Sequence, residues 1–310
     1  MALTLIEQAK LVQDPLQAGV IEVFPQTSPI LQYMPFMNVN HRSYTYNREE
    51  TLPGIAFRDF GEDYSEDTGV VNPVTEYLRI FGGHSDVDRA LVKTGGEVND
   101  IRAIHDRLKA KAAALFFTKK FIKGENSSST PDEFDGLEAR LTGNQLVAAG
   151  DTSGGDELTL DKLDELIDQV VGSPDILLMN KTMRRKVNKL MRAAGAAIET
   201  VNDQFGRQIP AYASIPIGVL EEDEEGNEIL AFDEDDASGD TDSSAECTSI
   251  YAVRFGEKEY LSGLQAGDLD VIDHGLYGGS VSYRTTIEWI SGFAVFHPKA
   301  AARLYGIKNA

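Results

Sequence analysis

The stretch SYTYNREETLPGIAF, residues 43–57, and the stretch VTEYLRIF, residues 74–81, carry aromatic or aliphatic side chains on alternating positions. A period of two is typical of strands with one apolar face. Turn signals at Pro53-Gly54 and Gly82-Gly83 interrupt the pattern, and a two-stranded ribbon is only marginally stable alone in water. The sequence therefore predicts that residues 39–93 form an extended ribbon, with no helix nearby, whose apolar side packs on another copy of the chain.

A long helix is predicted next, over residues 96–123. Thr94 and Glu97 have the spacing of a capping box, and Gly124 marks the end of the helix. At about 1.5 Å per residue this helix would be about 40 Å long. Its apolar stripe, which we interpret as core, consists of Ile101, Ile104, Leu108, Ala112, Leu115, Phe117, Phe121 and Ile122.

The composition limits the classes of function. The 310 residues carry a formal net charge of −21, which argues against a protein whose main surface follows a phosphate backbone. A single cysteine, Cys247, excludes an internal disulfide and a multi-cysteine metal site. The first residues lack the pattern of a signal peptide, and no run approaches the roughly 18 apolar residues that span a bilayer. We expect a soluble protein that is made in the cytoplasm and has no membrane partner.

The second half of the chain alternates helical and extended patterns, which favours an α/β lobe beginning near residue 158. Asn180 is placed to cap the second of two helices. The predicted elements are a helix from about 158 to 171, a buried strand at 175–179, a helix at 181–194, strands at 215–220, 228–232, 249–255 and 280–296, and a closing helix at 298–307.

Sequence motifs for catalysis are absent. The chain has no nucleophile elbow, phosphate-binding loop or dinucleotide fingerprint, and its five histidines do not form a metal-binding pair in sequence. His105 lies beside the helix stripe and is interpreted as a core residue. We therefore predict no catalytic residue, no metal site and no cofactor, and expect that the protein is not an enzyme.

Two segments carry strongly unbalanced charge. Residues 221–246 contain thirteen acidic residues and no Lys or Arg. The start resembles a calcium loop, but Phe232 stands where the bidentate Glu belongs, so a hairpin turning near Gly226-Asn227 and a solvated acidic loop are preferred. The helix after Asn180 is basic. It could contact nucleic acid, be a solvated face, or attract a neighbour's acidic surface, and we favour the last.

The order of these parts resembles the major capsid protein of tailed bacteriophages, the Hong Kong 97-like shell fold, over essentially the whole chain. The turn Phe134-Asp-Gly-Leu137 is also similar to a stretch common in such proteins after the long helix. The resemblance implies an α+β fold. Its parts would be an N-terminal arm (1–38), an extended β-hairpin loop (39–93), a peripheral domain with the spine helix (94–157), an axial α/β domain (158–275) and peripheral return strands (276–310).

The resemblance implies a structural protein that self-assembles, as hexamers and pentamers, into an icosahedral shell around viral double-stranded DNA. The virion capsid would be its location, after assembly in the host cytoplasm. Some relatives crosslink through a lysine in the extended loop, but this chain has no lysine between Lys10 and Lys93. Noncovalent contacts or a decoration protein would then hold the shell. A separate scaffolding protein and a portal are also implied, with weak non-specific proximity to packaged DNA.

Other hypotheses stay open. One is an encapsulin-type nanocompartment shell, which shares the fold but holds a cargo enzyme. Another is an α/β enzyme with a β-rich appendage. A calcium-dependent adhesive or tail protein is a further possibility. Under the capsid hypothesis we predict intersubunit contacts at Tyr44, Tyr46, Ile55, Phe57, Tyr77, Phe81, Arg184, Arg185 and Lys189.

Overall fold

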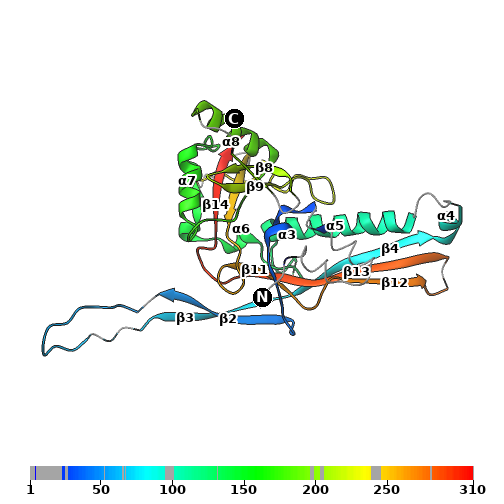
Figure 1. Cartoon of the computed structure of the whole chain (residues 1–310), viewed down its shortest axis with the longest axis horizontal. Helices are drawn as coiled ribbons and strands as arrows, with labels where there is room; N and C mark the ends of the chain where they lie inside the picture. The colour runs from blue at the N-terminus through cyan, green and yellow to red at the C-terminus, as the bar shows by residue number, and fades with distance from the viewer. Residues whose placement is uncertain are drawn as a thin grey trace.

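The computed structural model describes most of the chain, and Figure 1 shows a rounded upper lobe, a helix-and-strand arm to its right and a thin ribbon to its left. Within the described residues, no helix combines the length and apolar character that crossing a bilayer requires. The described residues are 4, 23–24, 27–51, 53–64, 66, 68–94, 101–130, 132–195, 199–202, 206–238, 246–279 and 281–309.

A five-stranded sheet forms the extension on the right of Figure 1 and continues beneath the lobe. It contains β1 (Phe36–Asn38), β4 (Arg79–Asp88), β11 (Leu261–Gln265), β12 (Asp270–Leu276) and β13 (Ser282–Val295). β13 pairs antiparallel with β4, β11 and β12, and β1 joins β11 in parallel. The 14 residues of β13, at about 3.4 Å each, span about 48 Å. The strand predicted at 280–296 is therefore confirmed, and it organises the whole sheet.

The long helix α5 (Ile101–Lys123) lies along this sheet (Figure 1). Phe117, Phe121 and Ile122 are fully buried, as the stripe predicted. The core prediction is wrong at Ile104 and Leu108, which are 49% and 59% exposed, and at His105, which is also exposed. The face of α5 that packs on the sheet carries Ala110 and Ala114 instead. The residues predicted to form the first turn, together with most of the capping box, lie outside the described residues. A short helix, α4 (Arg89–Thr94), follows β4.

Gly124 ends α5 where the sequence predicted. Its amide donates to the Lys120 carbonyl at 2.9 Å, and its own carbonyl accepts from the Gly136 amide at 2.7 Å. A Cβ at Gly124 would collide with the Phe134 carbonyl oxygen. The chain returns here, through the segment around residues 134–141, to a short helix, α6 (Leu137–Arg140).

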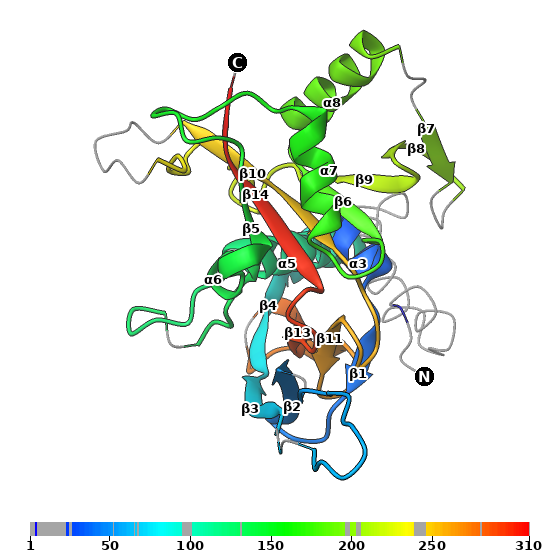
Figure 2. The same ribbon diagram turned by 90° about the vertical axis from the view of Figure 1, so that its left-hand side faces the viewer.

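A seven-stranded sheet forms the upper lobe. Its order is β5 (Leu146–Ala148), β14 (Ala301–Lys308), β10 (Cys247–Val253), β6 (Ile176–Met179), β9 (Ile215–Val219), β8 (Gln208–Tyr212) and β7 (Glu199–Asn202). Parallel pairs (β5–β14 and β6–β9) and antiparallel pairs occur together. Figure 2 shows the lobe from the side, with the helices in front of the strands.

Helices cover both faces of the seven-stranded sheet. In β6, Leu177 and Met179 pack with α7 (Leu160–Asp168) and α8 (Lys181–Ala193), whereas Ile176 and Leu178 face the opposite side. That side is covered by α5, α6 and a short helix, α3 (Pro29–Tyr33). The side chain of Asn180 accepts the Met183 amide at 2.8 Å, so the predicted cap of α8 is confirmed.

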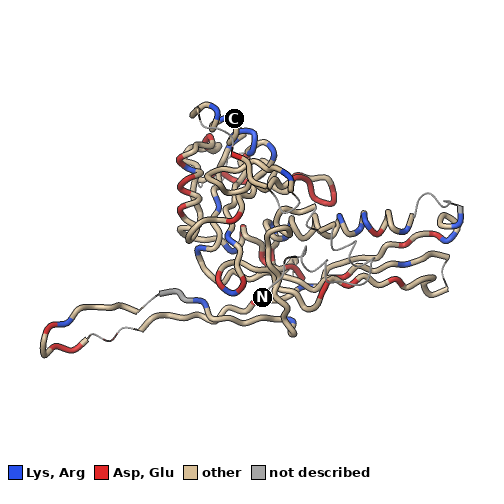
Figure 3. Tube along the Cα trace, in the orientation of Figure 1, with Lys and Arg blue, Asp and Glu red and all other residues tan. Residues whose placement is uncertain are grey.

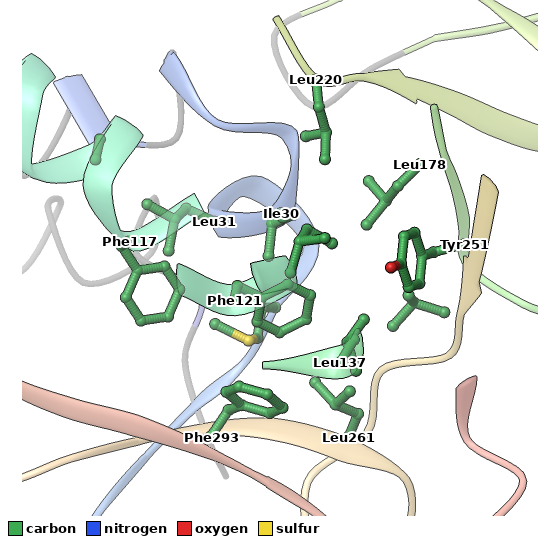
Figure 4. Packing of buried hydrophobic residues seen from close by; sticks show 14 of the residues in the cluster. Ile30, Leu31, Phe117, Phe121, Leu137, Leu178, Leu220, Tyr251, Leu261 and Phe293 are labelled. Carbon is green, nitrogen blue, oxygen red and sulfur yellow. The ribbon is translucent and has the colours of Figure 1, made fainter. Parts of the chain in front are cut away.

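One apolar cluster joins the two sheets. Figure 4 shows Phe121 of α5 between Phe293 of the five-stranded sheet and Leu178 and Tyr251 of the seven-stranded sheet. The Phe121 and Phe293 ring centroids are 4.7 Å apart. Because residues far apart in sequence fill this junction, both sheets and α5 share one core.

The ribbon on the left of Figure 1 consists of β2 (Ser43–Thr51) and β3 (Val70–Tyr77). They pair antiparallel, with Tyr46 opposite Val74. The prediction of an extended segment is confirmed here. It is wrong beyond Tyr77, because the chain enters β4, which pairs with β13 and packs under α5.

Two element predictions are wrong. The segment 298–307 contains β14 instead of a closing helix, because its alanines are buried between β10 and β5, which supply the ladder partners. The segment 228–232 forms a turn with one bridge, between Glu222 and Glu228. Local composition favoured a helix in the first case and a strand in the second, and tertiary pairing overrode both.

Candidate assembly surfaces

The far end of the ribbon exposes large apolar side chains. In residues 53–64, here called the exposed loop, Ile55, Phe57 and Phe60 are 98%, 107% and 103% exposed. A local turn shapes the loop: the Asp59 carboxylate accepts the Phe60 amide at 2.8 Å, and Gly61 has a φ of +85°. Burying such a side chain is worth about 1.5–3 kcal/mol. The described residues provide no such burial, so another molecule would have to.

Tyr46, at the near end of the ribbon, lies inside the chain. Its ring centroid is 4.6 Å from that of Phe296, and its hydroxyl donates to the Val295 carbonyl at 2.8 Å. Burial, together with the Glu76 carboxylate, raises the pKa of Tyr46 above its ordinary value. Tyr44 is half-buried and stacks beside Tyr46. The expectation that a neighbour completes this apolar face is therefore wrong at Tyr46, because the chain covers it itself.

An ion pair fixes the same end of the ribbon. Arg140 of α6 donates two hydrogen bonds to the Glu76 carboxylate of β3 in a bidentate ion pair, with 2.8 Å between Nη2 and Oε2. The Arg140 guanidinium also lies over the Phe293 ring, 4.5 Å from its centroid. The Arg140 and Glu76 side chains are only 17% and 11% exposed. Sequence reasoning missed this pair, because 63 residues separate its members and nothing local links them.

Phe81 and Tyr77 have different surroundings. Phe81 packs against Phe116, Phe117 and Trp289 at centroid distances of 5.9, 6.0 and 5.6 Å. The interpretation of Phe81 as part of an uncovered face is therefore wrong, because α5 lies over it. Tyr77 is 54% exposed at the end of β3, and its role as an intersubunit contact stays a prediction.

The basic helix presents its cations outward. α8 buries Met183, Val187 and Met191, so the basic residues between them must point away from the sheet. Arg185 and Lys189 are exposed. An open hollow of about 450 Å³ lies along this face, lined by Lys181, Thr182, Arg184, Arg185, Asn188, Arg192 and Pro210.

The described part of the acidic segment is attached to α5. Asp223 pairs with Lys119 at 2.7 Å, and Asp233 pairs with Lys123 at 3.0 Å. Burial raises the pKa of Asp223, but the bonds from Lys119 and from the amides of Asn227 and Glu225 outweigh it and lower that pKa to about 2. The turn predicted at Gly226-Asn227 is present. The acids thus have a structural partner that the sequence did not reveal.

The remaining reactive side chains do not converge. His84 of β4 and His274 of β12 both hydrogen-bond Thr286 of β13, at 2.8 and 3.0 Å, although they are 190 positions apart in the sequence. The Cys247 thiol is buried, and burial raises its pKa. Among the described residues, no three His, Cys, Asp or Glu side chains gather in a way that could hold a metal ion.

Comparison with known proteins indicates which protein family the chain is similar to. Residues 13–159 match the family model described as "Major capsid protein GP7". The match covers slightly less than half of the chain, and together with the fold it supports a shell-forming major capsid protein. A search of curated protein sequences gave no match.

Solved structures show that the chain has the Hong Kong 97-like fold, as the sequence predicted. The holo-SrpI encapsulin complex from Synechococcus elongatus PCC 7942 superposes with a TM-score of 0.65 at 17% identity, covering 92% of this chain and 89% of that chain. The capsid of an empty GTA particle gives 0.62 at 16%, covering 91% and 90%. The structure titled "Mycobacterium phage Bobi" gives 0.57 at 13%, covering 91% of both chains. At these identities the likeness shows the fold alone, and the family match points to the phage capsid class.

Proposed function

We propose that the capsid protein assembles, as hexamers and pentamers, into an icosahedral shell that encloses double-stranded viral DNA. Assembly takes place in the host cytoplasm, and the chain has no catalytic role. The domain organisation follows the predicted division into an arm (1–38), an extended loop (39–93), a peripheral domain (94–157), an axial domain (158–275) and return strands (276–310). The one change is that the extended loop ends at Tyr77, because β4 belongs to the five-stranded sheet. The division is supported by two sheets that share one junction around α5.

The main support for this proposal is the exposed loop. Ile55, Phe57 and Phe60 project at the end of a ribbon that leaves the body of the molecule (Figure 1). Monomeric proteins rarely expose a group of large apolar side chains without a partner for it. The loop therefore lies on an adjacent subunit of the shell. Tyr44, Tyr77 and the basic face of α8 add smaller contacts.

The partners other than the chain itself are proposed from the resemblance to tailed-phage capsid proteins. A separately encoded scaffolding protein and a portal complete the assembly, and a decoration protein is a further partner. The net charge of −21 keeps contact with packaged DNA weak and non-specific. Tight binding would hinder both packaging and release of the DNA, so an acidic protein suits this role.

Electron microscopy of the expressed protein tests the proposal. The purified chain is imaged in negative stain, with and without the candidate scaffolding protein, and closed shells with pentamers and hexamers are expected. A small oligomer of fixed size under all conditions would contradict the proposal.

The encapsulin alternative rests on the overlay with the SrpI encapsulin, and particle contents decide between the two functions. Shells isolated from the native host should contain double-stranded DNA. Shells that instead hold one co-purifying enzyme would favour the nanocompartment.

A further inference from the structure

The outer face of α7 is acidic. Leu163 and Leu166 are buried against the sheet, which leaves Asp161, Glu165 and Asp168 exposed on the other side. The single cation of the helix, Lys162, already pairs with Glu165 at 2.8 Å. Among the described residues, no cation outside α7 forms an ion pair with this face, so most of its charge is uncompensated there.

The outer face of α8 is basic. Arg184, Arg185 and Lys189 have no ion pair with a described residue. Lys181 does pair with Glu221, at 2.9 Å, but both side chains are more than half exposed. On a chain whose net charge is −21, this helix without a single acidic residue is a local exception.

The two helices lie on the same face of the seven-stranded sheet but over different strands. α7 packs on β5, β10 and β14, and α8 packs on β9. Figure 3 shows the acidic residues of α7 along the left edge of the upper lobe and the basic residues of α8 across its top. Two different patches on one subunit suit a head-to-tail contact, which closes into a ring when the rotation per subunit allows it.

We propose that the basic face of α8 on one subunit docks against the acidic face of α7 on the next subunit of the same capsomer. The inference rests on the proposed shell function and names the partner of the α8 surface. A second copy of the chain fits better than a nucleic acid. Each added copy brings one acidic and one basic face, so each basic face in a closed ring meets an acidic face. A phosphate backbone on α8 would instead lie close to the acids of α7 and be repelled.

Charge exchange tests the contact. One variant combines Arg184→Glu, Arg185→Glu and Lys189→Glu, and a second combines Asp161→Lys, Glu165→Lys and Asp168→Lys. Each variant alone should raise the protein concentration needed for assembly by about tenfold or more, because like charges then face each other. The variant carrying all six substitutions should return to within about threefold of the wild type, since the pairing is reversed but complementary.

Circular dichroism and thermal melting of the unassembled variants check folding. If the α8 triple variant fails to fold, the neutral pair Arg185→Gln and Lys189→Gln replaces it. In that case, added salt between low and moderate ionic strength should weaken assembly less than it weakens assembly of the wild type.

If both triple variants fold but the variant with all six substitutions does not recover assembly, the inference is overturned while the proposed shell function stands. The same conclusion follows if the α8 variant assembles like the wild type but packages less DNA, because α8 would then be a nucleic-acid surface. A wild-type chain that forms no shell would overturn the proposed function itself.

Discussion

Removing two aromatic side chains from the exposed loop should block assembly without weakening the subunit. Phe57→Ala and Phe60→Ala change rings that are fully exposed, so the free energy of unfolding of the monomer should change by less than about 0.5 kcal/mol. In the shell each ring gains about 1.5–3 kcal/mol on burial. The double variant therefore loses about 3–6 kcal/mol per subunit contact. Ordering the loop offsets part of this, which leaves about 100-fold in the association constant.

Light scattering against protein concentration measures this loss. The concentration at which scattering rises marks the onset of assembly, and it should increase by about two orders of magnitude in the double variant. Sedimentation velocity should find the variant as free subunits or small oligomers at concentrations where the wild type forms particles. Chemical denaturation of both proteins below the assembly threshold should give overlapping curves.

Phe81→Ala is the matched control. It removes the same kind of side chain, but Phe81 lies in β4 and packs on α5 and Trp289 within the chain. Its loss should destabilise the monomer by about 2–4 kcal/mol. If Phe57→Ala with Phe60→Ala lowered the melting temperature as Phe81→Ala does, or assembled at the wild-type threshold, the reasoning from exposure would be refuted.

Three further predictions concern the inside of the subunit. Arg140→Ala removes the ion-pair partner of the buried Glu76 carboxylate. It should lower the free energy of unfolding, measured in urea, by about 3–5 kcal/mol. The double variant Arg140→Ala with Glu76→Ala should recover part of this loss. Tyr46→Phe removes the hydroxyl that donates to a carbonyl of β13 and should cost about 1–2 kcal/mol in the same assay. The folded-state pKa of Asp223, about 2, lies below its ordinary value, so its pairing with Lys119 stabilises the fold above pH of about 4 and is lost as the pH falls towards 2. Asp223→Asn should flatten the dependence of thermal stability on pH in that window, and an unchanged slope would contradict the assignment.

Local sequence patterns determined the elements whose signals are contained within a few turns. Helical spacing of apolar residues, closed by Gly124, placed the end of α5, and Asn180 marked the start of α8. Alternation predicted β13 and the ribbon at Tyr44–Tyr46. These features depend on which face of one segment is apolar and on how its ends satisfy free backbone groups.

Only the tertiary structure decided which apolar faces the chain covers itself. Ile55 and Tyr46 belong to the same alternating region, yet one is fully exposed and the other is buried under Phe296. The difference arises because β13, more than 200 residues later in the sequence, passes one end of the ribbon and not the other. A local sequence pattern cannot show which end of the ribbon lies next to β13.

Long-range pairing also decided the wrong predictions. The alanine-rich segment near the C-terminus suits a helix by itself, but β10 and β5 offer it hydrogen-bonding partners on both sides, and it becomes β14. Glu76 finds Arg140, and the acidic segment finds α5, for the same reason. The sequence alone determined the order of the parts and the excess of negative charge. The folded chain decided which charges and rings meet, because such contacts depend on packing between segments that are remote in the chain.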